Sequence, residues 1–175
     1  MTAAKEDIKA REKFSSRGKT YWLILRGRWG LAVDRHLVRW TGFSLITWQY
    51  AKAGGVPYRP VILLTTTGAR TGRERRAVLP FYQRGANFII VGSNGGGPKD
   101  PNWVINLRAS PDCAVRYQSR SQPMQAHVPA GEERDRLLED LAAEQPFVRN
   151  YDTETRRNGR ELPLVVLTPR ADTVH

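Results

Sequence analysis

The stretch VILLTTTGARTGRERRAVLPFY, residues 61–82, holds two apolar runs separated by a polar segment rich in glycine and arginine. Residues 61–66 and 77–83 have the β-branched and aromatic composition of strands, so we predict two consecutive strands joined by a loop. Four arginines fall between residues 70 and 76, and only Glu74 offsets their charge. The feature that needs an explanation is this concentration of positive charge in a strand connection.

The arginine-rich loop has the chemistry of an anion site. Gly68 and Gly72 permit positive φ and let a ligand approach the backbone, and successive loop N–H groups can form an anion-binding nest. Arginine side chains add charge-assisted donors. Alternation along the second strand predicts that Arg75 shares the core-facing side of Ala77 and that Arg76 lies on the opposite face. The alternative is a solvated hairpin tip, where both residue types are common.

A second unusual loop, GSNGGGPKDPNWVINL at residues 92–107, follows a predicted strand and leads into a predicted helix. Three consecutive glycines cost conformational entropy, which makes sense where the backbone must lie against a flat or charged group. Trp103, in the first turn of the helix, would lie beside a ring-binding surface. The alternatives are a flexible tip for the glycines and core packing for Trp103.

The rest of the chain from residue 56 on is mostly β in pattern. Further strands are predicted at residues 88–92, 114–118, 124–128 and 164–168, with hairpin turns at 84–87 and 119–121. One helix is predicted from Asp100, as N-cap, and Pro101 to about residue 109, and another over residues 132–143. Six strands with few helices favour a mainly β (α+β) fold with a small barrel-like sheet over a doubly wound one.

The first 55 residues differ from the rest, because they hold four of the five tryptophans. The pattern over residues 33–53 is roughly helical, Gly42 weakens the helix, and Gly54, Gly55 and Pro57 are expected to end it. The residues expected near one face of this helix are Val33, Leu37, Trp40 and Trp48. We therefore predict a helical extension, residues 1–55, that packs on or caps a barrel domain, residues 56–175.

Composition narrows the class of protein. The net charge of +11 predicts an anionic partner, and 22 of the 28 basic residues are arginine, whose planar fork suits phosphate and carboxylate. A GC-rich gene would also raise the arginine content, although it would not cluster the arginines in one loop. Cys113 is the only cysteine, residues 1–16 lack the apolar core of a secretory signal, and no run is long enough to span a membrane. We expect a cytoplasmic protein.

The sequence shows no side-chain catalytic apparatus. His36, His127 and His175 lack metal-ligand spacing, so no metal site is predicted, and no Ser/His/Asp order stands out. Two kinds of function then remain: binding without catalysis, or catalysis by a cofactor that brings its own chemistry.

Three segments together resemble the deazaflavin-dependent nitroreductase family, whose members are F420-dependent oxidoreductases and quinone reductases. They are LLTTTGARTGRERRAVLPFY, VGSNGGGPKDPNWVINLRASPD and YDTETRRNGRELPLVVLTP. The resemblance implies a split β-barrel of the flavin-reductase type and coenzyme F420, an 8-hydroxy-5-deazaflavin with a phosphate and an oligoglutamate tail. The implied activity is an F420H2-dependent reductase that transfers a hydride from C5 of the deazaflavin to a quinone, activated enone or nitroaromatic acceptor.

The resemblance also implies site residues. The phosphate and tail would lie on Arg70, Thr71, Gly72, Arg73 and Arg75. The ring and its linker would be surrounded by Ser93, Asn94, Gly95, Gly96, Pro101, Asn102, Trp103 and Asn106. Tyr151, at the acceptor pocket, and Ser93 are the expected catalytic residues. A prodrug-reducing member has lysine at the position of Asn94 and tyrosines at those of Gln145 and Val148, which border its acceptor pocket, so we expect quinone or enone reduction to exceed nitroimidazole reduction.

Two other functions fit the same residues. One is a non-catalytic protein that binds or carries F420, and the other is a nucleic-acid-binding barrel. The arginines lie beside glycines more than beside aromatic residues, which is unlike a base-stacking surface, so the expected partner is a small-molecule electron acceptor and not nucleic acid. The N-terminal extension could cover the pocket or make a weak peripheral contact with a membrane.

Overall fold

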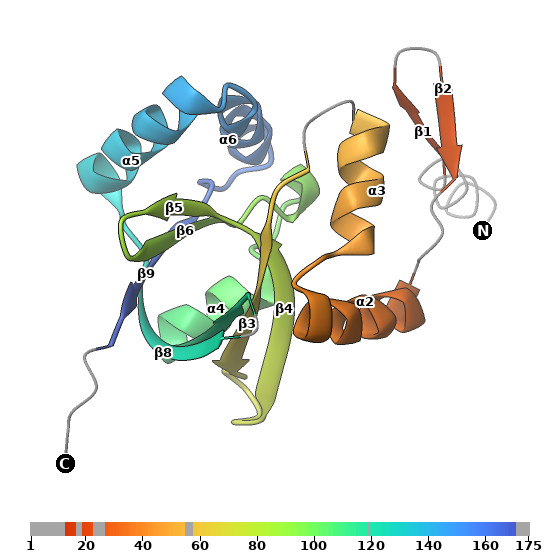
Figure 1. Cartoon of the computed structure of the whole chain (residues 1–175). Helices are drawn as coiled ribbons and strands as arrows, with labels where there is room; N and C mark the ends of the chain where they lie inside the picture. Colours follow the sequence, from red (N-terminus) through yellow and green to blue (C-terminus); the bar gives the residue numbers. More distant parts are fainter. Residues whose placement is uncertain (1–12, 17–18, 23–26, 55–57, 119, 171–175) are drawn as a thin grey trace.

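The computed structural model describes residues 13–16, 19–22, 27–54, 58–118 and 120–170 (Figure 1). Its centre is a curled seven-stranded sheet in which every pair of neighbouring strands is antiparallel. The strand order is β4-β3-β7-β8-β9-β6-β5. The strands are β3 (Val61–Thr67), β4 (Glu74–Pro80), β5 (Tyr82–Arg84), β6 (Asn87–Val91), β7 (Asp112–Tyr117), β8 (Arg120–His127) and β9 (Leu164–Pro169). The predicted mainly β, barrel-like class is confirmed.

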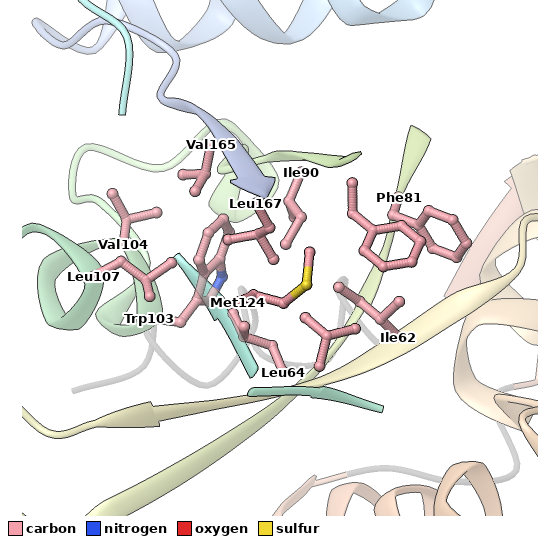
Figure 2. Close-up of a cluster of buried hydrophobic side chains, with 12 residues drawn as sticks. Ile62, Leu64, Phe81, Ile90, Trp103, Val104, Leu107, Met124, Val165 and Leu167 are labelled. Atoms are coloured by element: carbon pink, nitrogen blue, oxygen red, sulfur yellow. The ribbon is translucent and has the colours of Figure 1, made fainter. Parts of the chain in front are cut away.

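The barrel is open between its two edge strands. β4 and β5 do not pair with each other, although only Phe81 separates them in the chain. Phe81 is buried and packs edge to face against Phe88, with ring centroids 4.9 Å apart. The interior of the curl is filled by aliphatic and aromatic side chains, among them Met124 and Leu64 (Figure 2). This shared core holds the two edges near each other without ladder hydrogen bonds between them.

Strand β4 begins earlier than its composition predicts. Glu74, Arg75 and Arg76 pair with Thr67, Thr66 and Thr65 of β3, so the connection shortens to residues 68–73. Ala77 packs against the barrel core and Val78 against a separate cluster beside α2, which confirms the predicted alternation. Two of the arginines thus belong to a strand, and a strand fixes their spacing more firmly than a loop would.

Two local predictions about the second hairpin and its neighbouring helix were wrong. Pairing of Tyr117 with Arg120 moves the hairpin connection to residues 118–119, of which Ser119 lies outside the described residues. Helix α4 (Asn102–Ala109) is preceded by Pro101 at its N-cap, and Asp100 is not the cap. The Asp100 carboxylate instead accepts hydrogen bonds from two arginines, Arg108 and Arg160.

The C-terminal third contains the predicted helix and one that the sequence reading missed. α5 (Gly131–Glu144) matches its predicted range closely, whereas α6 (Phe147–Arg157) was not predicted. The two helices cover the side of the sheet near β5, β6 and β9 (Figure 1). The face that α6 buries is short and partly polar, with Val148, Asp152 and Thr155, so its apolar periodicity is weak.

Helices α2 (Gly27–Thr41) and α3 (Leu45–Gly54) lie beside β3 and β4, and β1 (Lys13–Ser16) and β2 (Lys19–Trp22) form a separate hairpin (Figure 1). The single predicted helix is broken at Gly42, which has φ +72°. The Asp34 carboxylate accepts hydrogen bonds from Ser44 Oγ (2.7 Å) and from the N–H of Ile46 (3.1 Å), which ties the two helices together. No helix among the described residues has the length and apolar character that a membrane span requires.

The residues expected near one face of this helix do not form the buried face of α2. Gly30, Asp34 and Val38 are buried, and Val38 packs against Val61 and Leu63 of β3. The face that carries Val33, Leu37 and Trp40 points away from the barrel, and the side chain of Trp40 is 76% exposed. Gly55 and Pro57, which were expected to end the helix, lie outside the described residues, as do residues 1–12 of the predicted extension. The division at residue 55 stays a prediction.

A buried ion pair joins α5 to α6. Arg134, 2% exposed, donates to the Asp152 carboxylate and to the carbonyl of Leu162 (3.3 Å). Arg156 donates to the other Asp152 oxygen at 2.8 Å. Burial raises the pKa of Asp152, but hydrogen bonds from Arg156 and Arg134 outweigh burial, and the net pKa is lowered.

Replacing Asp152 tests how much this pair stabilises the fold. Asp152→Ala should lower the free energy of unfolding by about 3–5 kcal/mol, because it leaves the buried Arg134 charge with only the exposed Asp135 as an ionic partner. Asp135→Ala is the matched control: that carboxylate also bonds Arg134 but is exposed, so its loss should cost less than about 1 kcal/mol. Urea unfolding of the two variants measures the difference, and equal losses would contradict the assignment.

The same pair predicts a pH dependence. Because the folded pKa of Asp152 is lowered, its stabilising effect is complete above the ordinary aspartate pKa of about 4 and is lost as the pH falls through the lower folded value. Unfolding curves of wild type and Asp152→Ala should therefore converge at acid pH.

Candidate functional site

A cleft of about 1330 Å³ lies between α2, the β3–β4 hairpin, the glycine-rich loop and α4. The residues predicted for a cofactor that line it are Arg70, Thr71, Arg75, Ser93, Asn94, Gly95, Pro101, Asn102, Trp103 and Asn106. Gly72, Arg73 and Gly96 belong to the same two loops but do not line the cleft. The fold thus brings together two loops that are more than 15 residues apart in the sequence.

The arginine-rich loop is closed on itself. The N–H of Gly68 donates to the Arg73 carbonyl (2.8 Å), and the N–H groups of Thr71 and Gly72 donate to the Gly68 carbonyl. A Cβ on Gly68 would lie 3.0 Å from Thr71 Oγ1, so Gly68 is needed for this close approach, whereas Gly72 has the expected positive φ of +63°. Because these N–H groups bond within the loop, they do not form the predicted nest, and anion binding falls to the side chains.

The cleft is strongly basic at this end. Arg70, Arg75 and Arg76 line it from the hairpin. Among the described residues, the only carboxylate that lines it is Glu74, which pairs with Arg76 at 2.6 Å. Arg75 donates weakly to Thr71 Oγ1 (3.4 Å) and pairs with no carboxylate of the described residues. The charge that remains suits an anionic ligand.

Asn106 connects the basic loop to α4. It is buried, its Oδ1 accepts from the N–H of Ala69 (3.0 Å), and its Nδ2 donates to Thr66 Oγ1 (3.1 Å). Both ends of the amide are therefore used within the protein, although Asn106 also borders the cleft. Its bonds position the basic loop, and the contact with the ring that the resemblance implies stays a prediction.

The glycine-rich loop forms a 3₁₀ turn, η1 (Asn94–Gly96), with positive φ at all three residues: +46° at Asn94, +62° at Gly95 and +77° at Gly96. Backbone conformation thus explains Gly95 and Gly96 directly. A Cβ on Gly96 would lie 3.3 Å from Glu154 Cβ of α6. A side chain at Gly96 would therefore strain the loop with or without a ligand, so such a variant cannot report on a bound ring.

Arg160, which the sequence reading did not single out, holds this loop in place. Its guanidinium donates to the carbonyls of Ser93 (2.6 Å), Gly97 (2.8 Å) and Gly92 (3.3 Å), and its side chain is only 10% exposed. Asp100 balances the charge at 3.1 Å. The loop is anchored and not a free tip. No local pattern reveals this role, because the partners lie more than 60 residues away in the chain.

Of the remaining residues predicted for the site, one lines the cleft and two do not. Trp103 borders the cleft and is also part of the barrel core, with 9% of its surface exposed (Figure 2). Its core packing is confirmed, and its contact with a ring stays a prediction. Tyr151 lies on α6, 38% exposed and edge to face with Phe147, outside the residues that line the cleft. Val148, expected beside an acceptor pocket, is instead fully buried in the core between α5, α6 and the sheet.

Two other reactive side chains lie away from the cleft. Burial raises the pKa of Cys113 to about 11, with a smaller contribution from Asp112, so its thiol stays protonated at neutral pH. Exposed His127 contacts Glu133 at 2.9 Å. Within the part of the chain that the structure describes, no three His, Cys, Asp or Glu side chains gather as metal ligands.

Comparison with known proteins points to one family. The family model described as F420H(2)-dependent quinone reductase matches residues 45–169. An F420H(2)-dependent quinone reductase of Mycobacterium tuberculosis (strain H37Rv) is 34% identical over 116 residues, which cover 63% of this chain and 74% of the relative.

Two solved structures resemble the fold. One is an F420-H2 dependent reductase, FDR-A, with a TM-score of 0.53 and 32% identity over 62% of this chain and 94% of the other. The second is described as a domain-swapped dimer, with a TM-score of 0.54 and 27% identity over 79% and 96% of the two chains.

Arg160→Met should release the glycine-rich loop. The substitution leaves three loop carbonyls without a charged donor, so the free energy of unfolding should fall by about 2–3 kcal/mol. Amide hydrogen exchange over residues 92–100 should accelerate, and Arg160→Lys should restore part of the protection because one ammonium reaches fewer carbonyls. Arg157→Met, which removes an exposed arginine paired with Glu154, is the control and should change neither quantity. Unaltered exchange in Arg160→Met would show that the loop is held by other contacts.

Proposed function

The chain belongs to the F420H(2)-dependent quinone reductase family, and from this premise we propose that the cleft is an F420 site at which a quinone is reduced. The observation that carries the proposal is the cleft itself, where a basic end formed by Arg70 and Arg75 adjoins the anchored loop at Ser93–Gly95. A cofactor with a ring at one end and several negative charges at the other matches that division.

The donor set fits such a cofactor. Arg70 and Arg75 carry charges that no carboxylate of the described residues neutralises, and phosphate or carboxylate groups would supply the missing partners. The lining residues between Val91 and Asn106 are mainly backbone, amide and apolar groups, including Trp103 and Ile105. This second part suits a flat ring that needs an apolar surface and few hydrogen bonds.

The protein's role in the reaction is binding and orientation. Reduced F420, when bound, supplies the hydride, so the side chains need not provide a nucleophile. Arg70 and Arg75 would hold the anionic part, and the Arg160-anchored loop would fix the place of the ring. Ser93 borders that place and Tyr151 carries a phenol that could donate a proton to an acceptor oxygen.

The acceptor class is proposed from the family and from the departures in the sequence. Asn94 borders the cleft as an amide that donates to the Lys99 carbonyl (2.9 Å), and Gln145 stands at a second position where a nitro-reducing relative has a different residue. Quinones and enones should be reduced faster than nitroimidazoles.

The function is tested by oxidation of reduced F420 in the presence of a quinone, an enone and a nitroimidazole. Rapid turnover with F420H2 but not with reduced flavin mononucleotide is the expected result. Binding of F420 without turnover on any acceptor would favour the carrier function, and a preference for nitroimidazoles would overturn the ranking. No binding of F420 at all would contradict the cofactor site.

The same assay tests Tyr151. Tyr151→Phe should lower kcat with the quinone by up to about 10²-fold, since general acid help is lost and water replaces it in part. The dissociation constant for F420 should not change. Thr153→Ala, on the exposed side of the same helix, is the control. Equal rates for Tyr151→Phe and wild type on every acceptor would remove Tyr151 from the mechanism.

We also propose that α2 brings the protein to a membrane surface, where lipophilic quinones reside. Trp29, Val33 and Trp40 lie along one face of the helix and are 86%, 52% and 76% exposed. Exposed tryptophans on a helix with arginines are typical of interfacial binding to anionic lipid. The net charge of +11 adds attraction to such a surface.

Vesicle sedimentation tests this contact. Wild type should pellet with vesicles that contain anionic lipid and not with purely zwitterionic ones, and Trp29→Ser with Trp40→Ser should abolish pelleting. Wild type that stays in the supernatant with both vesicle types would exclude the contact and leave the protein in the cytoplasm without a membrane partner.

A further inference from the structure

Helix α2 forms one wall of the cleft, although it precedes the residues that match the family model, 45–169. Leu31, Arg35 and Arg39 recur every four residues and all line the cleft, as does His36. Residues four apart lie on one face of a helix. The cleft therefore has a basic wall that the family assignment does not account for.

The two walls carry the same sign of charge. Arg35 and Arg39 of α2 share one cleft with Arg70 and Arg75 of the β3–β4 hairpin. None of these four guanidinium groups pairs with a carboxylate of the described residues. The lining carboxylate, Glu74, is already paired with Arg76.

Like charges that line one cleft repel each other and concentrate the positive potential inside it. One phosphate brings at most about two negative charges, so it cannot balance four arginines on two walls. A chain with repeated carboxylates can, because each carboxylate can meet a separate guanidinium. Arg35 and Arg39 are separated by about 6 Å along the helix axis, a step that suits a ligand running lengthwise.

We infer that α2 binds the oligoglutamate tail of the cofactor, with Arg35 and Arg39 as its ligands, and that the protein thereby distinguishes cofactor forms by the length of the tail. The inference rests on the proposed function, because it requires F420 in the cleft. In this arrangement the arginine face and the tryptophan face of α2 lie on opposite sides of the buried residues Asp34 and Val38. The arginine face binds the tail, and the tryptophan face is left for other contacts.

Fluorescence titration of the bound deazaflavin tests the inference without turnover. Three probes are compared: the ring compound without phosphate or tail, F420 without glutamates, and F420 with a long tail. Wild type should bind the long-tailed form tightest. The double variant Arg35→Ala/Arg39→Ala should lose about 10-fold or more in affinity for the long-tailed form, and should bind the two tail-less probes like wild type. Arg35→Lys/Arg39→Lys should recover part of the loss.

Two control variants separate specific from general effects. Arg136→Ala/Arg149→Ala makes the same change in net charge on exposed arginines of α5 and α6 outside the cleft, and should bind every probe normally. Arg70→Ala/Arg75→Ala should weaken binding of F420 even without glutamates, because these two arginines of the cleft are proposed to hold the phosphate as well as the tail. All effects should shrink as salt rises.

The outcomes distinguish this inference from the function on which it rests. If wild type binds none of the three probes, the F420 site itself is wrong. If wild type binds and turns over F420 but its affinity does not depend on the tail, or the double variant on α2 binds the long-tailed form unchanged, only the inference is overturned. Displacement of the long-tailed form by single-stranded DNA as readily as by free oligoglutamate would also overturn it, since the wall would then be a general polyanion surface.

Discussion

The geometry of the cleft depends on one partly buried guanidinium, that of Arg160. It donates to three carbonyls of a loop whose positive φ values prevent it from joining a ladder or a long helix. Asp100 balances the charge, which makes burial of the arginine tolerable. With the loop held from the side of β9, its other side is free to border the cleft. The pair of Arg134 and Asp152 supports the same loop indirectly. It holds α6 against α5, and Glu154 of α6 lies next to Gly96 of the loop.

The basic side of the cleft is built by different means. The loop at residues 68–73 uses its own N–H groups for closure, and Asn106 fastens it to α4. Arginine side chains therefore carry the positive charge. Helix α2 places Arg35 and Arg39 about one turn apart on one face, and strand β4 places Arg75 beside the cleft. A rigid arrangement of this kind lowers the entropy lost when a flexible anionic ligand binds. The high arginine content of the chain is therefore partly explained by the arginines that the fold gathers at one cleft.

Hydrophobic patterning predicted the elements whose burial is mainly apolar. Strands β3, β6 and β9 and helix α5 were placed within a few residues, because each buries an uninterrupted or periodic apolar set. Helix α6 was not predicted, because its buried face includes a charged residue, Asp152, and so lacks a regular apolar pattern. On α2 apolar residues alone do not mark the buried face. That face holds Gly30, Asp34 and Val38, and hydrogen bonds from Ser44 and Ile46 satisfy the Asp34 carboxylate.

The sequence by itself determined the class of fold, the two loops and the residue types that border the cleft, because strand composition, glycine and arginine are local signals. Only the tertiary structure decided which of these residues face one another. It showed that Asn106 bonds the basic loop, placed Tyr151 outside the residues that line the cleft and brought α2 to its wall. It also revealed Arg160, whose partners precede it by more than 60 residues. Such contacts join positions far apart in the chain, and their physical cause, the need of buried carbonyls and charges for partners, leaves no trace in any short stretch of sequence.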